Sequence, residues 1–308
     1  MRILSSAVVW LFAALVCSGE SAAPVALPQR PVPAVKQVVI IIVDGLRPDV
    51  LLLADAPTLH GLVRNGAYSF WARTTDVAIT LPSCTSMLTG VSPQKHGVNW
   101  NTALPAGKDA YPAVPTVLEM ATRAGYVTAL VAGKSKFSAL AKPGTVTHVA
   151  VPTAVKISDE QVAVEAAKII AQFHPALLCI HFPDVDTAGH ADGWGSPDQL
   201  AQVARTDMQI AKVLAALEQA GLRDSTLVLV SADHGGAGKG HGADDMRSRH
   251  IPWVVSGPGV RAGHDLTLDA KLQIRTEDTC ATVCWLLGLP LPDYFEGRPV
   301  TAAFNRVP

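Results

Sequence analysis

Short, continuous apolar runs alternate along the chain with longer stretches that carry helix start and stop residues. The apolar runs predict buried strands, because strands of a parallel sheet are covered on both faces. These strands are expected at 37–43, 126–131, 176–182, 226–230 and 252–255. The intervening stretches predict helices, which are expected at 56–64, 82–88, 115–123, 158–173, 196–220 and 276–287.

The helix boundaries rest on particular residues. Ser158 is an N-cap candidate with Glu160 in the first turn, where a polar cap and a negative charge both stabilise a helix. Pro82 favours a helix start and Gly90 a helix end. Because strands and helices alternate, the sequence predicts an α/β fold with a mostly parallel central sheet. Right-handed crossovers then place helices on both faces of that sheet.

The first residues lie outside the predicted fold. Met1-Arg2 precedes an apolar stretch that ends in small residues, which predicts a signal peptide over residues 1–23. A membrane anchor is the alternative, but serines interrupt the run and it is marginal for a span of about 20 residues. Cys17 adds a lipoprotein alternative, although Val16 fits that poorly. We therefore expect an exported, periplasmic or secreted protein, with a Pro-rich leader over 24–35.

Composition narrows the possible functions. The chain has 308 residues, of which 49% are hydrophobic and 17% charged, with a formal net charge of -1. It therefore has no basic field for a nucleic acid polymer and no polybasic segment for a membrane surface. The cysteines beyond the signal peptide form no CxxC pair and lie in apolar surroundings, so we expect free core cysteines and no zinc–cysteine site. They are Cys84, Cys179, Cys280 and Cys284.

Seven residues of metal-ligand type are scattered over four segments. They are Asp44, Thr80, Asp186, His190, Asp233, His234 and His241. Three of the segments begin where a predicted strand ends, and ligands of α/β sheets bind beyond the carboxyl ends of the strands. Mixed carboxylate and imidazole ligands suit zinc or a similar divalent cation. Taken singly, each segment could be a plain turn or loop, but together they predict a site for two cations.

Thr80 is the candidate nucleophile. It stands between an extended run and the helix expected to begin near Pro82, and a helix N-terminus attracts an anion. A neighbouring cation would lower the pKa of the hydroxyl. Ser83 and Thr85 are alternatives, but both are expected inside the helix, where first-turn capping is their ordinary role.

Five motifs carry a resemblance to a known family. They are IIIVDGLRPD, ITLPSCTSMLTGVSPQKHGVNWN, DTAGH, SADHGG and GHG, and they occur in the family's order between about Lys36 and Val300. The chain resembles the alkaline phosphatase superfamily, most closely its type I phosphodiesterase/nucleotide pyrophosphatase family. The resemblance implies a single alkaline-phosphatase-like catalytic domain over 36–305.

The same resemblance implies two zinc ions. One would be held by Asp44, Thr80, Asp233 and His234, and the other by Asp186, His190 and His241. Thr80 would form a phospho-threonine that is then hydrolysed. The family's asparagine that holds a phosphoryl oxygen matches Asn101.

Further assignments concern residues near these motifs. Lys134, in GKSKF, is placed like a sulfatase lysine that contacts the anion, and the alternative for it is a solvated surface lysine. Asp184 and Asp192 flank the DTAGH motif and are expected to be solvated loop residues.

We therefore expect an exported, metal-dependent hydrolase of phosphoric esters, of phosphodiester or nucleotide pyrophosphate type, acting on a small-molecule ester. A phosphomonoesterase or phosphonate hydrolase is the main alternative. A sulfatase fits less well, because Thr80 cannot yield the sulfatase aldehyde, Cys84 replaces an arginine, and Gly45-Leu46 follow Asp44. A non-catalytic binding protein is disfavoured because all seven ligand positions are filled. Ser83 stands where the pyrophosphatases often carry Asn, and no large insertion could form a nucleobase pocket, so the leaving group stays open.

Overall fold

A computed structural model describes residues 29–103, 110–153, 155–242 and 245–305. The predicted signal peptide and the first part of the predicted Pro-rich leader lie outside these residues. The last leader residues are described, and there Val32 and Val35 are buried against the core. Within the described parts of the chain, no helix is both long and apolar enough to cross a membrane.

An eight-stranded sheet forms the centre of the described chain, in the order β4-β3-β5-β1-β6-β7-β2-β8. The predicted strands are β1 (Gln37–Val43), β3 (Thr128–Ala132), β5 (Leu177–Phe182), β6 (Thr226–Ser231) and β7 (His250–Ser256). Strands β1, β3, β5 and β6 are mutually parallel, whereas β7 runs antiparallel to β6 and β2. The predicted α/β fold with a mostly parallel sheet is confirmed.

Three strands were missing from the prediction. They are β2 (Ala67–Arg73), β4 (His148–Ala150) and β8 (His264–Asp265). Strand β2 alternates buried and more exposed positions near one edge of the sheet, so it lacks the continuous apolar run that marks the central strands. Strands β4 and β8 are too short for any pattern to reveal them.

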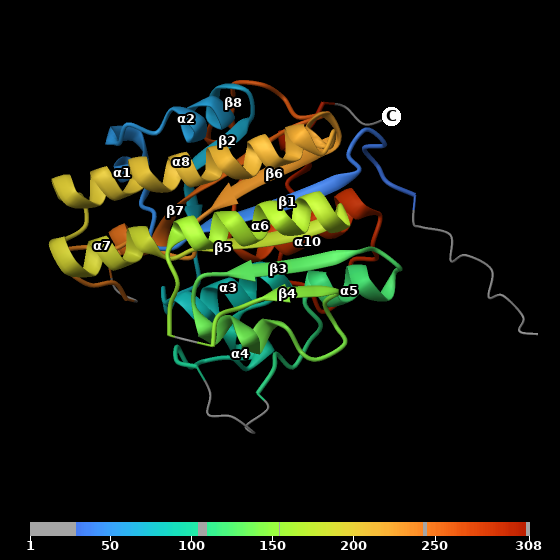
Figure 1. The fold of residues 1–308 in the computed structure, drawn as a ribbon, viewed down its shortest axis with the longest axis horizontal. Coiled ribbons are helices and arrows are strands. Elements are labelled where there is room, and N and C mark those ends of the chain that lie inside the picture. The colour runs from blue at the N-terminus through green and yellow to red at the C-terminus, as the bar shows by residue number, and fades with distance from the viewer. Residues whose placement is uncertain (1–28, 104–109, 154, 243–244, 306–308) are drawn as a thin grey trace, which may run out of the picture.

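Helices cover both faces of the sheet (Figure 1). On one face, α8 packs against its neighbours α1, α2, α6 and α7. Their bounds are α1 (Pro48–Leu53), α2 (Pro57–Arg64), α6 (Asp159–Phe173), α7 (Asp184–Asp192) and α8 (Pro197–Gln219). The other face carries α3 (Thr80–Thr89), α4 (Pro93–His96), α5 (Val117–Arg123) and α10 (Glu277–Leu287). Shorter elements are η1 (Ser135–Leu140), η2 (Arg223–Ser225), α9 (Met246–Arg249), η3 (Leu266–Leu268) and η4 (Thr301–Ala303).

Two local predictions near the candidate site were wrong. Helix α3 begins at Thr80, two residues before Pro82, with Ile79 in an extended conformation as its N-cap. Pro82 is tolerated inside the first turn because the first N–H groups of a helix have no intrahelical partner. The segment around Asp186 and His190 is not a loop but part of α7.

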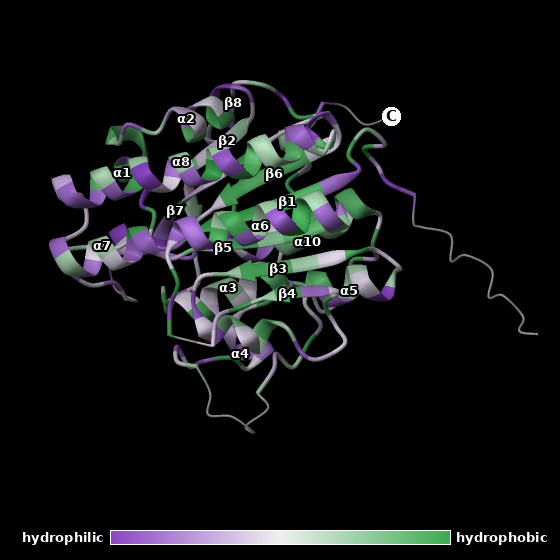
Figure 2. Ribbon diagram, in the orientation of Figure 1, coloured by the Kyte–Doolittle hydropathy of each residue, from purple (hydrophilic) through white to green (hydrophobic). Residues whose placement is uncertain are grey.

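The core consists mainly of the central strands. Six of the seven residues of β1 are buried, and all of β5 and β6 are buried. Figure 2 shows these strands as hydrophobic, whereas α6 and α8 carry hydrophilic residues on their visible surfaces. The four described cysteines are buried and free, which confirms that expectation. Ser158 forms the predicted cap, as part of a capping box with Gln161 at the start of α6.

Candidate active site

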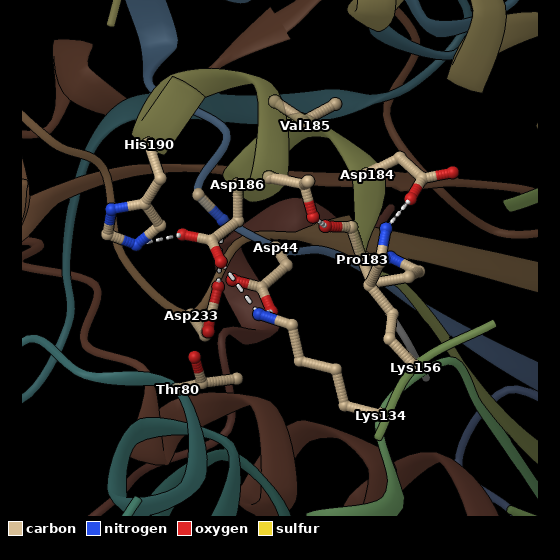
Figure 3. A network of polar contacts seen from close by, with 12 residues as sticks. Asp44, Thr80, Lys134, Lys156, Pro183, Asp184, Val185, Asp186, His190 and Asp233 are labelled. Carbon is tan, nitrogen blue, oxygen red and sulfur yellow. Dashed lines mark hydrogen bonds and ion pairs between the residues drawn. The ribbon is translucent and has the colours of Figure 1, made fainter. Parts of the chain in front are cut away.

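The candidate ligands converge at the carboxyl edge of the sheet. Asp44 directly follows β1, Asp186 lies on α7 just after β5, and Asp233 with His234 follows β6. Strand β1 pairs in parallel with both β5 and β6, so the three chain segments leave the sheet side by side. Figure 3 shows Asp44, Asp186 and Asp233 turned toward one another, with Thr80 facing them from α3.

Helix α7 places Asp186 and His190 on one helix face, because residues four apart in a helix lie one above the other. His190 Nε2 lies 3.4 Å from Asp186 Oδ1. His241 comes from the glycine-rich loop, and its Nε2 lies 3.7 Å from the same oxygen. The His241 ring stacks on His234 with a centroid distance of 3.7 Å. The predicted set of Asp186, His190 and His241 is therefore gathered in one place.

The remaining predicted ligands surround His234. Its Nε2 lies 3.4 Å from Asp44 Oδ1, 3.3 Å from Asp233 Oδ2 and 3.4 Å from Thr80 Oγ1. These four residues are at most 1% exposed. In the structure, Asp44 and His234 also share a potential cation position with Asp186. The two halves of the site are thus joined through the Asp186 carboxylate rather than separate.

Trp194 packs against several segments of the site, a role that no motif in the sequence indicates. The indole Nε1–H donates to the carbonyl of Gly45, 2.8 Å away. A Cβ on Gly189 or on Gly236 would lie within 2.7 Å or 2.3 Å of the indole ring. Glycine is therefore required at both positions by the close packing of this ring, which ties the loop after β1, helix α7 and the loop after β6 together.

The three carboxylates are buried close together, so nearby positive charge stabilises their ionised forms. Burial opposes ionisation of Asp44, but the Lys134 ammonium and a hydrogen bond from His181 hold its pKa well below the usual range. Burial and the charge of Asp44 raise the pKa of Asp233 well above the usual range. Like charges this close cannot all ionise cheaply unless a cation compensates them.

The carboxylate oxygens and imidazole nitrogens of the site are suited to binding such a cation. Asp44 Oδ1, Asp186 Oδ1 and Asp233 Oδ2 are buried and have no hydrogen-bond partner. Burial, together with His234, lowers the pKa of His241 to about 4, so its ring is neutral at pH 7, as a metal ligand must be. Two groups of residues could each hold a cation, namely Asp186, His190 and His241, and Asp44, Asp186 and His234. Unpaired carboxylate oxygens close to imidazole nitrogens match the ligand preference of zinc and similar divalent ions.

Lys134 is not a solvated surface lysine. Its ammonium lies 2.6 Å from Asp44 Oδ2 and 2.7 Å from Asp186 Oδ2, and its side chain is only 14% exposed. Burial would lower the pKa of Lys134, but the two carboxylates raise it, so the side chain stays protonated. The ammonium thus supplies part of the positive charge that the cluster requires.

Asn101 and Lys136 form a second polar group beside Thr80. Asn101 Oδ1 accepts hydrogen bonds from the N–H of Leu81, 3.0 Å away, and from Lys136 Nζ, 2.7 Å away. The side-chain oxygen of Asn101 is therefore already hydrogen-bonded, to the first turn of α3 and to Lys136. Among the described residues, no hydrogen bond involves the Asn101 NH2 group, which can therefore donate to a bound anion. Sequence reasoning had assigned no role to Lys136.

Neighbouring polar residues have structural partners instead. Thr85 donates to the carbonyl of Leu81, and the Ser83 hydroxyl pairs with Thr75 Oγ1 at 2.8 Å. Asp192 is exposed at the end of α7. Asp184 was wrongly predicted to be a solvated loop residue, because it pairs with Lys156 at 2.6 Å and accepts from the N–H of Asp159 at 2.8 Å. It fixes the start of α7 against α6.

His181 is a further residue that sequence reasoning missed. It lies on β5 opposite Ile42 and is fully buried, with its ring packed on Phe137. Its Nε2–H donates to Asp44 Oδ2 at 2.9 Å. Burial lowers the pKa of His181, so the ring is neutral. The hydrogen bond orients the carboxylate so that Oδ1 faces His234.

The chain was compared with known proteins. A family model described as type I phosphodiesterase / nucleotide pyrophosphatase matches residues 38–246. Zebrafish (Danio rerio) arylsulfatase K is 31% identical over 112 residues, which are 35% of this chain and 21% of that protein. The catalytic subunit of human (Homo sapiens) GPI ethanolamine phosphate transferase 2 is 26% identical over 294 residues, which are 88% of this chain and 29% of that protein.

The chain thus spans less than a third of the length of these curated relatives. Among solved structures, murine ectonucleotide pyrophosphatase/phosphodiesterase 5 in complex with AMP superimposes with a TM-score of 0.74 at 15% identity. That alignment covers 88% of this chain and 100% of the other, and it establishes a shared fold.

We predict that His181→Ala weakens binding of Zn²⁺ by about tenfold to a hundredfold, because the partner that orients a ligating carboxylate is lost. Competition with a chromogenic chelator measures the affinity. His181→Gln keeps an N–H donor and should recover part of the loss. His264→Ala, on β8, is the matched control and should bind like the parent protein. An unchanged affinity in a folded His181→Ala protein would contradict the role of this hydrogen bond.

Proposed function

The chain belongs to the type I phosphodiesterase/nucleotide pyrophosphatase family, and on this premise we propose that it is an exported, metal-dependent hydrolase of phosphoric esters. The proposed substrates are small phosphodiesters or nucleotide pyrophosphates. One observation carries the proposal. The Thr80 hydroxyl lies at the N-terminus of α3, 3.4 Å from His234 Nε2, inside a buried cluster of carboxylates and imidazoles. The proposal that the protein is exported rests on the apolar segment within residues 1–23.

The proposed cofactors are two divalent cations, with zinc favoured by the mixture of carboxylate and imidazole donors. One position would use Asp44, Thr80, Asp233 and His234. The other would use Asp186, His190 and His241. When bound, such ions lower the pKa of a coordinated hydroxyl and neutralise charge on the attacking and leaving oxygens. The unpartnered oxygens of the three aspartates support this assignment.

Thr80 is the proposed nucleophile. Its Oγ1 attacks phosphorus in line with the leaving oxygen, forming a threonine–phosphorus ester bond and breaking the bond to the leaving alcohol. The Thr80 N–H at the start of α3 and the Asn101 NH2 group would donate to the non-reacting phosphoryl oxygens, since the Leu81 and Ser83 N–H groups already have partners and Pro82 has no N–H. Asn101 is oriented for this task by the hydrogen bonds that its own oxygen accepts from Leu81 and Lys136. Water then cleaves the threonine ester and restores the hydroxyl.

A phosphomonoesterase or phosphonate hydrolase is the second candidate. Two lysines favour it, because Lys134 contacts Asp44 and Asp186 while Lys136 contacts Asn101. Their charges would suit the extra negative charge of a monoester. A sulfatase reaction is not proposed although arylsulfatases are among the relatives, because a threonine cannot be converted to the aldehyde nucleophile and Cys84 is fully buried.

We predict that Thr80→Ala abolishes turnover of bis-p-nitrophenyl phosphate while the protein still binds metal. Thr80→Ser should keep partial activity, because it retains the attacking hydroxyl. Release of p-nitrophenol measures the first property, and elemental analysis of the purified variant measures the second. Hydrolysis by Thr80→Ala above the metal-free background would overturn the nucleophile assignment.

Metal content is expected to be about two divalent ions per folded chain, in keeping with a two-ion site. Mass spectrometry of the purified protein after dialysis against zinc measures the number of ions bound per chain. Asp186→Ala should lower it to about one, because in the proposed assignment this carboxylate is a ligand of only one of the two cations. Less than one ion per chain in the parent protein would favour a non-catalytic binding protein.

Side-by-side rates decide between the candidate reactions. We expect the protein to hydrolyse bis-p-nitrophenyl phosphate faster than p-nitrophenyl phosphate, and p-nitrophenyl sulfate more slowly than either. The three compounds release the same product, so a single absorbance assay compares them. Preference for the monoester would favour the second candidate, and preference for the sulfate would contradict a phosphoric ester hydrolase.

A further inference from the structure

A cavity lies at the same edge of the sheet as the candidate active site. Its volume is about 550 Å³, within the range of small-molecule sites. Its lining includes Trp71 and Arg73 at the end of β2, Arg249 just before β7, and Arg275 with Glu277 at the start of α10. We refer to it as the arginine pocket. No residue of the proposed catalytic or metal-binding set lines it.

The pocket and the candidate active site share a wall. Strand β2 runs parallel to β6, two places away in the sheet, which corresponds to a separation of about 10 Å. The segment 74–78 forms the wall. Thr74 donates to the carbonyl of Asp233, and the carbonyl of Ala78 lies 2.9 Å from His241 Nδ1.

The arginine pocket is lined by three arginines and by three acidic residues, Asp76, Asp269 and Glu277, and these charges are not fully paired. Arg275 forms an ion pair with Glu277 at 2.9 Å, and Arg249 pairs with Asp76, whose side chain is 82% exposed. Such a solvent-exposed pair is weak and exchanges easily for a ligand. Among the described residues, the Arg73 guanidinium has no hydrogen-bond or ion-pair partner, although its backbone is fixed by bonds to Ile274 and Thr276.

Buried polar atoms in the lining give a second, independent indication of a ligand. Arg249 Nε and Glu277 Oε2 are buried without a hydrogen-bond partner, and Glu277 is 1% exposed. Leaving such groups unpaired is costly. A donor and an acceptor are thus available in the same pocket lining as the exposed Arg73. Guanidinium groups suit planar or tetrahedral oxyanions such as carboxylate and phosphate.

We propose that the arginine pocket binds a second anionic group, a carboxylate or phosphate, on the part of the ester that lies beyond the scissile phosphorus. This rests on the proposed function, since it concerns the substrate of the same reaction. Arg73 makes the principal contact with the anion, and Glu277 and Arg249 accommodate hydroxyl or carbonyl groups near it. The preferred substrate is therefore an ester that carries a second anionic group besides the scissile phosphate.

Two diesters of similar size test the charge preference. In bis-p-nitrophenyl phosphate both aryl groups are uncharged, and in bis(4-carboxyphenyl) phosphate both carry a carboxylate. The measured quantity is the ratio of the KM of the carboxylated substrate to that of the nitrated one. Arg73→Ala should raise this ratio about tenfold, the value of one charge-assisted hydrogen bond. Arg73→Lys should raise it less, because a point charge remains.

Arg205→Ala is the matched control, because it removes the same charge from an exposed position on α8. Its ratio should stay within about twofold of the parent value. The inference is wrong if the parent protein hydrolyses both diesters and Arg73→Ala leaves the ratio within twofold, or if Arg205→Ala raises the ratio equally. The proposed function would survive that result, whereas a parent protein that hydrolyses neither diester would overturn the function itself.

Discussion

The repulsion among three buried carboxylates is the constraint on which this molecule depends. Asp44, Asp186 and Asp233 leave neighbouring strands at one edge of the sheet, where water is excluded. Ionised carboxylates in such surroundings cost several kcal/mol each unless they are paired. Lys134 bridges Asp44 and Asp186, and the remaining oxygen of each lies 3.4 Å from an imidazole nitrogen. The cluster has too much negative charge for one lysine, and this excess gives it an affinity for cations.

The surrounding fold keeps these charges in place. Parallel strands bring the three segments together, and the hydrogen bonds of the sheet prevent them from moving apart. Trp194 packs against the glycines of two segments and donates to the third. His181 orients Asp44 by a hydrogen bond from β5. Asp184 fixes the start of α7, the helix that carries Asp186, by accepting from the N–H of Asp159 on α6. A site held in this way loses little entropy when a ligand binds, which is the benefit of preorganisation.

The shape of the molecule around the site bears on substrate choice. Thr80 faces the carboxylates from the opposite helical layer, with Asn101 and Lys136 beside it. The arginine pocket lies on the other side of the segment 74–78. A charged substrate would therefore meet cationic groups on both sides of the scissile bond. In the proposed binding mode, an ester with a second anionic group would pair with Arg73, whereas a neutral group would form a weaker contact there.

The sequence by itself determined the central strands, the main helices, the two-sided α/β architecture and the candidate ligands. Buried strands appear as continuous apolar runs, and the ligands lie in short motifs, so both can be recognised from local sequence. Only the tertiary structure decided how those residues act. Local patterns could not reveal that α3 begins at Thr80, because Pro82 suggests a later start, or that Asp186 lies on a helix. They also could not reveal His181, Trp194 or the buried state of Lys134, since each role depends on contacts between segments far apart in the chain. Charge compensation and packing are properties of the assembled site, and no single segment contains them.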